Sequence, residues 1–117
     1  FELGDFRSGY YRDQTFMMAL GELDAVKFFT SLYAVTDVKE EPMAGGRQMN
    51  GHFATRSLDE NGQWVDLTAQ YNSSSDISPT AGQMPRLLGL AQASKVYKEV
   101  SFEGSEKFSK AGNEVAA

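Results

Sequence analysis

Arg12 is the residue whose surroundings point most directly to chemistry, because it follows two tyrosines, Tyr10 and Tyr11, and precedes a stretch of helical apolar spacing. A guanidinium in that position can pair bidentately with a phosphate or carboxylate group. An exposed arginine with a purely structural role is the alternative, and the residues alone favour it. Arg12 therefore marks Tyr10–Gln14 as a first candidate anion-binding segment.

Two further polar segments could contribute to such a site. Gly45–Phe53 holds three glycines with Arg47 and His52 between them, and glycine permits close approach of the backbone to another group. Asp76–Gln83 leads into an apolar helical pattern, and the free N–H groups of a helix start favour anions. A plain glycine loop and an ordinary helix cap are the alternatives. The three segments could line one anionic-ligand site, although nothing in the sequence requires them to meet.

Other classes of chemistry are excluded by composition. The single histidine, His52, rules out a multi-histidine metal site, and the absence of cysteine rules out disulfides and thiolate zinc sites. A formal charge of −5 argues against a nucleic-acid surface, and no apolar run approaches the roughly 20 residues of a membrane helix. Asp76 is expected to form a local turn, and Glu40-Glu41 to be a solvated charge pair. Without cysteine or a signal-peptide pattern, we expect a cytoplasmic protein.

The first half of the chain predicts two helices. Phe1–Gly9 reads as irregular. A helix of about ten residues should follow Tyr10–Gln14 and end at Gly21. A second helix should begin near Glu22 and fade by Thr36. Its apolar residues recur at i, i+3 and i+4, which predicts a buried stripe of Leu23, Val26, Phe29 and Tyr33.

The second half predicts a hairpin and a third helix. Asn61-Gly62 is the preferred pair for a tight two-residue turn, so Thr55–Leu67 should form a small hairpin packed down by Trp64. Pro85 would break a helix that began at Ser78, so we expect a later start, near Thr80–Gly82, and an end near Lys98. The small residues in this helix would allow tight packing. Beyond it, Ser101–Gly112 should be a loop with a helical turn, and Glu114–Ala117 the start of a strand.

In this order, the three polar segments resemble the thiamine-diphosphate-dependent 2-oxo acid dehydrogenases. The similarity is to the alpha-type half of the decarboxylating component, especially in bacterial enzymes with fused alpha and beta parts. Four motifs match: Tyr11-Arg12-Asp13, Gly46-Arg47-Gln48-Met49 with His52-Phe53, Ser78–Pro85, and Gly112–Ala116. The last resembles the strand that leads to a Gly-Asp-Gly-type motif in the family. The second motif is typical of branched-chain members. The family's potassium-binding loop has a serine and a threonine where this chain has Ile77 and Gly82.

The resemblance implies a role for each matching residue. Tyr11 and Arg12 would contact the diphosphate of the cofactor. Ser78 and Thr80 would face its aminopyrimidine ring, largely through backbone groups, and His52 would be a catalytic residue at the mouth of the active site. No metal ligand falls within the chain, and magnesium would be bound by residues beyond it. Residues 1–117 would then be a single partial domain, a mainly α fragment with long loops and a small hairpin, from an α/β thiamine-diphosphate-binding fold.

The function implied by the resemblance is that of a 2-oxoisovalerate dehydrogenase. Such an enzyme oxidatively decarboxylates a branched-chain 2-oxo acid and passes the acyl group to a lipoyl-bearing acyltransferase. Its expected partners also include the beta-type half of the same enzyme and a further copy of itself in a homo-oligomer, and the fragment alone should be inactive. A pyruvate dehydrogenase-type relative and a non-enzymatic helical interaction module are the alternatives.

Overall fold

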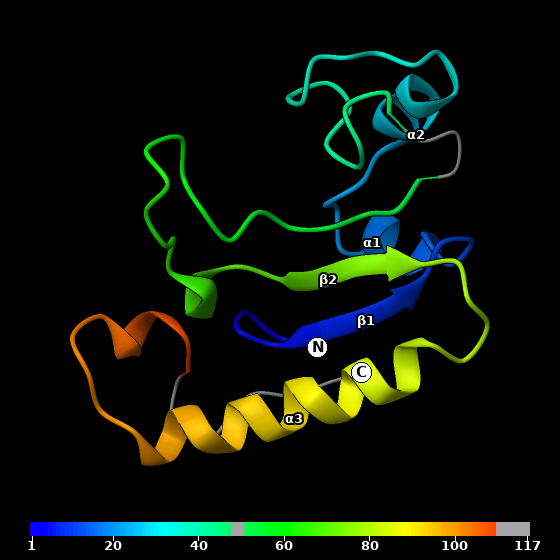
Figure 1. Ribbon diagram of the computed structural model, residues 1–117. Helices are drawn as coiled ribbons and strands as arrows, with labels where there is room; N and C mark the ends of the chain where they lie inside the picture. Colours follow the sequence, from blue (N-terminus) through cyan, green and yellow to red (C-terminus); the bar gives the residue numbers. More distant parts are fainter. Residues whose placement is uncertain (48–50, 110–117) are drawn as a thin grey trace. The chain divides into compact units, whose positions relative to one another are not determined.

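The structure is a computed structural model that describes residues 1–47 and 51–109, and within them the fold is mixed α/β. Its regular elements are β1 (Phe6–Tyr10), α1 (Thr15–Ala19), α2 (Ala25–Leu32), β2 (Asn72–Ile77) and α3 (Gln83–Glu99), with short 3-10 turns at Leu67–Ala69 and Ser105–Lys107 (Figure 1). Two compact units are formed. The first contains residues 1–8, 55–74 and the described chain from 84 onward, and the second contains residues 9–54 and 75–83.

β1 and β2 pair with each other in parallel, so both arrows in Figure 1 point the same way. The backbone bonds advance together along the two strands, from Gly4 N to Gln70 O at 2.9 Å and on to Tyr11 N to Ile77 O at 3.1 Å. In a parallel pair the carboxyl ends of both strands lie at the same edge. The segments that follow β1 and β2 therefore leave the sheet side by side, and both belong to the second unit.

Neither strand was predicted. The expectation of an irregular Phe1–Gly9 is wrong from Phe6 onward, and the polar segment expected at Asp76–Gln83 begins inside β2. β2 is rich in serine, which has little preference for strands. Its backbone is nevertheless bonded along the second edge as well, by Thr55 N to Ser73 O at 3.0 Å and Asp76 N to Phe53 O at 2.9 Å. Asp76 is consequently buried inside the strand instead of forming a turn.

Both helices of the second unit are present but shorter than predicted. α1 spans five residues, and Gly21 lies after it at φ +80°. α2 is capped by Asp24, whose carboxylate accepts the Lys27 N–H at 2.8 Å, so it starts after Glu22.

The predicted buried stripe of α2 is wrong. Val26, Phe29 and Tyr33 are 67, 53 and 81% exposed, and only Leu23, which precedes the helix, is buried. Within α2 itself Ser31 is the buried residue, and the side that carries Val26 and Phe29 is exposed.

The core of the second unit is small. Met17, Leu23, Met43 and Phe53 form it, with Phe16 and Leu20 packed around them. These residues come from α1, from the chain after it and from two loops. The contacts that form the core therefore also hold the two loops in position, although neither loop contains a long helix or strand.

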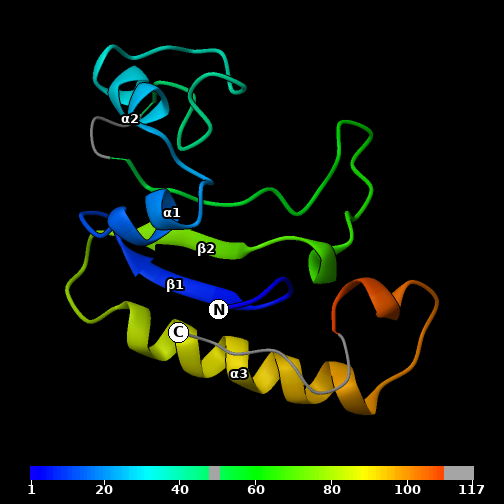
Figure 2. The ribbon, with the colours of Figure 1, turned by 180° about the vertical axis from the view of Figure 1, so that it is seen from behind.

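Glu41 fastens the loop between α2 and the glycines, and the expectation that it is solvated is wrong. Its side chain is fully buried. The carboxylate accepts backbone N–H groups from Met43 at 2.9 Å, Ala44 at 2.8 Å and Gly46 at 3.0 Å. Figure 2 shows this loop wrapped beside α2. Desolvation of the carboxylate is thus offset by three charge-assisted hydrogen bonds.

The glycines of this loop allow its backbone to pass close to other backbone of the same chain. Gly46 has φ +70°, and a Cβ placed on it would lie 2.6 Å from the carbonyl oxygen of Ala34. The close approach predicted for the glycine loop is therefore a contact with neighbouring backbone. Gln48 and Met49 of the sequence motif, and the strand expected at Glu114–Ala117, lie outside the described residues.

In the first unit, the predicted hairpin is present with a longer turn. Leu58 and Trp64 form an antiparallel bridge, and Asn61-Gly62 lies within the loop between them. The Asp59 carboxylate accepts the N–H groups of Asn61 and Gln63 and so orders this loop. The Trp64 ring packs edge-to-face on Phe108 at 5.1 Å, as its expected packing role requires.

The late start of α3 is confirmed. The helix begins at Gln83, which places Pro85 in its first turn, where no intrahelical N–H is needed. Leu90, Ala93 and Tyr97 line one cavity with Phe6 and Leu67, so this face of α3 is turned toward its own unit. No residue of α3 is fully buried. Among the described residues, no helix is long and apolar enough to cross a membrane.

We expect Gly89→Ala to raise the free energy of unfolding by about 1 kcal/mol, because alanine has the higher helix propensity. The site is in mid-helix, and a Cβ there meets no atom of the described residues within 4 Å, so the tight packing expected of the small residues is not found at this position within the described chain. Urea unfolding would measure the change. The matched control is Gly21→Ala, which also meets nothing within 4 Å but stands at φ +80° and should lower stability. Destabilisation by Gly89→Ala would show that something packs against this face of α3.

Candidate functional site

The segment after β1 is held in place by one glutamine. Gln14 is buried, and its Nε2 donates to the carbonyl oxygens of Tyr11 at 3.1 Å and Gly51 at 2.7 Å. The first bond closes the turn that carries Arg12. The second ties this turn to the residue before His52. A single amide therefore joins two of the three polar segments identified in the sequence.

His52 and Ser78 join the second and third segments. His52 Nε2 lies 2.6 Å from Ser78 Oγ, within hydrogen-bond distance. The imidazole also stacks on Tyr11, with ring centroids 5.6 Å apart and the planes inclined by 13°. These contacts follow from the parallel strands, because Tyr11 and Ser78 are the first residues after β1 and β2 and leave the sheet at the same edge. The pair can share a proton between imidazole and hydroxyl.

Arg12 provides an exposed positive charge beside this pair. Its Nη2 donates to the Tyr10 hydroxyl at 3.1 Å, and the guanidinium carbon lies 5.2 Å from the Tyr10 ring centroid and 5.4 Å from that of Tyr11. The hydrogen bond to Arg12 lowers the pKa of Tyr10, and hydrogen bonds to Tyr11 and Thr80 act in the same direction. The same hydrogen bond to Tyr10 raises the pKa of Arg12, so the guanidinium remains charged. Two tyrosines thus orient a cation that solvent and ligands can reach.

We expect Arg12→Gln to raise the pKa of Tyr10, because the largest cause of its lowering is removed. Since the folded-state pKa of Tyr10 is the lower one, phenolate formation favours folding above the ordinary value of 10.0 and this contribution is lost as the pH falls through the folded-state pKa. Tyrosine ring carbon-13 signals, with Tyr10→Phe for assignment, would follow the titration. An unchanged midpoint in Arg12→Gln would contradict the contact.

All five residues expected at the site lie in the second unit and within one network of contacts. Tyr11 stacks on His52, His52 bonds Ser78, and Arg12 and Thr80 both interact with Tyr10. Sequence reasoning missed the part played by Tyr10 and Gln14, although both stand in the segment that Arg12 marked. Nothing in the sequence pointed to Ser31 of α2.

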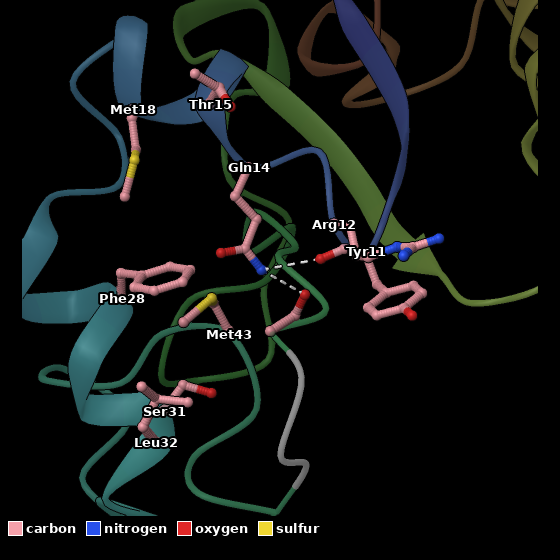
Figure 3. Close-up of a pocket in the computed structure, with 10 residues that line it drawn as sticks. Tyr11, Arg12, Gln14, Thr15, Met18, Phe28, Ser31, Leu32 and Met43 are labelled. Carbon is pink, nitrogen blue, oxygen red and sulfur yellow. Dashed lines mark hydrogen bonds between the residues drawn. The ribbon is translucent and has the colours of Figure 1, made fainter.

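A cavity of about 400 Å³ lies within the second unit beside this network (Figure 3). Its lining comes from the turn after β1, from α1 and α2 and from the two loops: Tyr11, Arg12, Gln14, Thr15, Met18, Phe28, Ser31, Leu32, Met43 and Gly51. Figure 3 shows the side chains of Tyr11 and Arg12 directed away from Phe28 and Met43. Tyr11 and Arg12 therefore line one side of the cavity, and Phe28 and Met43 line another.

The described part of the chain contains no group of three or more histidine, cysteine, aspartate or glutamate side chains placed to hold a metal ion. Comparison with known proteins gave no match to a family model, to a curated protein or to a solved structure. The geometry of the second unit and the sequence motifs therefore carry the functional argument.

Proposed function

We propose that this chain is part of a thiamine-diphosphate-dependent 2-oxo acid dehydrogenase that acts on a branched-chain 2-oxo acid. One observation carries the proposal. Three of the four motifs that resemble this family are distant in sequence, and their residues are joined by direct contacts, from Tyr11 to His52 and from His52 to Ser78. They gather where two parallel strands end, and ligands of open α/β sheets are bound beyond the carboxyl ends of the strands.

The residues present fit the chemical groups of the cofactor. The exposed Arg12 guanidinium is complementary to a diphosphate, and Tyr10 holds it in place. Ser78 and Thr80 are both exposed, and their backbone N–H and C=O groups are hydrogen-bonding groups suited to an aminopyrimidine. His52 stacks on Tyr11, and its Nε2 forms a hydrogen bond with Ser78 Oγ. When bound, thiamine diphosphate supplies the stabilised thiazolium carbanion that such decarboxylations use.

Further parts of the enzyme would be supplied from outside residues 1–117. We expect magnesium ligands there, together with the beta-type half of the enzyme, a second copy in a homo-oligomer and a lipoyl-bearing acyltransferase as acyl acceptor. The finer fold, a thiamine-diphosphate-binding domain of which this is the N-terminal piece, and the cytoplasmic location belong to the same proposal.

Calorimetric titration of the full-length protein with thiamine diphosphate and magnesium tests the proposal. We expect saturable binding, and steady-state oxidative decarboxylation that is faster with 2-oxoisovalerate than with pyruvate. The reverse preference would assign the protein to the pyruvate-type alternative. Absence of cofactor binding to a folded full-length protein would overturn the proposal.

The alternative of a non-enzymatic interaction module is favoured by one observation, the exposed apolar face of α2. Val26, Phe29 and Tyr33 are each more than half exposed, and large exposed apolar groups commonly mark protein contacts. Such a module requires no cofactor. The same calorimetric experiment therefore separates it from the enzyme.

A further inference from the structure

Two residues that line the cavity of the second unit, Gln14 and Ser31, each carry a buried polar atom without a hydrogen-bond partner in the described part of the chain. Gln14 and Ser31 are only 6% and 5% exposed, and among the described residues neither Gln14 Oε1 nor Ser31 Oγ makes a hydrogen bond. Buried polar side-chain atoms in native proteins nearly always have a partner, because leaving one unpaired lowers stability. Both residues line the same cavity. The cavity therefore holds unsatisfied hydrogen-bonding capacity from two separate elements.

The orientation of the Gln14 amide is determined by its surroundings. Nε2 donates to two carbonyl oxygens, those of Tyr11 and Gly51. Exchange of the amide oxygen and nitrogen would place an acceptor against two acceptors, so the assignment is secure. Figure 3 shows the remaining oxygen on the side of the amide that faces Phe28. Gln14 consequently offers the cavity an acceptor that calls for an N–H or O–H donor.

The rest of the cavity is suited to an aliphatic group. Met18, Phe28, Leu32 and Met43 provide apolar walls. The Arg12 side chain is directed away from these walls, so its charge lies on the other side of the turn (Figure 3). A volume of about 400 Å³ is in the range of small-molecule sites. Apart from Arg12, the side chains that line the cavity are uncharged, so placing an ion against its apolar walls is unfavourable and a neutral ligand is favoured.

We propose that this cavity binds a neutral aliphatic carboxamide. The ligand's N–H donates to Gln14 Oε1, its carbonyl oxygen accepts the hydroxyl of Ser31, and its alkyl group packs on Met18, Phe28 and Met43. A carboxamide satisfies both orphaned atoms, because it carries a donor and an acceptor on one small group. The proposal needs neither thiamine diphosphate nor Arg12, so it stands independently of the proposed function.

Titration of the full-length protein with isovaleramide, in the absence of thiamine diphosphate, provides the first test. Carbon-13-labelled methionine methyl groups report on the cavity through Met18 and Met43, and Met84 in α3 serves as an internal reference. We expect saturable shifts of the first two signals and none of Met84. Methyl isobutyl ketone has nearly the same shape but no N–H, and it should bind about tenfold more weakly.

Ser31→Ala provides the second test, because it removes one orphaned atom without adding bulk. We expect this variant to bind isovaleramide about tenfold more weakly, while the ligand-free protein melts at the same or a higher temperature. Ser101→Ala, at an exposed position of the first unit, should change neither property. Absence of saturable shifts, equal binding of amide and ketone, or unchanged affinity in Ser31→Ala would each overturn the proposal.

Discussion

Replacement of Glu41 with alanine is expected to lower the free energy of unfolding by about 3 kcal/mol, since hydrogen bonds to a charged acceptor are strong and their loss leaves buried donors unpaired. The carboxylate accepts the N–H groups of Met43, Ala44 and Gly46, and it is fully buried. The same loop places Met43 in the core. The substitution therefore weakens the loop and the core together. Urea unfolding followed by circular dichroism would measure the loss.

Glu40→Ala is the matched control for Glu41→Ala, because the two residues are adjacent and Glu40 is exposed. Its expected effect is below about 0.5 kcal/mol, as for most surface substitutions. Glu41→Gln should lie between the two, because an amide has one acceptor oxygen where the carboxylate has two. Equal effects of the alanine substitutions would contradict the assignment of these hydrogen bonds to Glu41.

Replacement of Arg12 with alanine is expected to weaken thiamine diphosphate binding to the full-length protein by roughly 10- to 100-fold, the range expected for charge-assisted hydrogen bonds. Arg12 is the exposed cation of the network, and Tyr10 and Tyr11 support it on one side. Calorimetry with magnesium present would measure the affinity. The effect should decrease at high salt, because the guanidinium acts on an anion from an exposed position.

Two variants sharpen the interpretation of the Arg12 result. Arg12→Lys keeps the charge but loses the bidentate geometry, so it should recover part of the affinity. Arg56→Ala removes an exposed arginine of the first unit and should leave the affinity unchanged. Equal affinities of Arg12→Ala and the unmodified protein would remove Arg12 from the cofactor site.

Local signals in the sequence predicted the helices best where a single residue dictates the backbone. Pro85 required a late start for α3, and the helix begins at Gln83. Apolar spacing was a poorer guide to burial. In α2 it identified a helix correctly and its buried face incorrectly, because spacing does not say which side of a helix the rest of the chain covers.

The strands could not be read from local preferences. β2 is a serine-rich segment whose backbone is bonded on both edges, by β1 and by the chain around Phe53 and Thr55. Those partners are distant in sequence, and tertiary pairing outweighs the weak strand preference of serine. The burial of Glu41 was missed for a similar reason, because its three partners form a local nest that composition does not reveal.

The sequence by itself excluded cysteine-based and multi-histidine chemistry, and its resemblance to a known family predicted five site residues, namely Tyr11, Arg12, His52, Ser78 and Thr80. Whether those residues meet was decided only by the tertiary structure. Two strands that are distant in sequence pair in parallel, so the segments after them emerge at one edge and bring Ser78 to His52 and His52 to Tyr11. The cavity with Gln14 and Ser31 likewise arises from packing between elements, which no single stretch of sequence specifies.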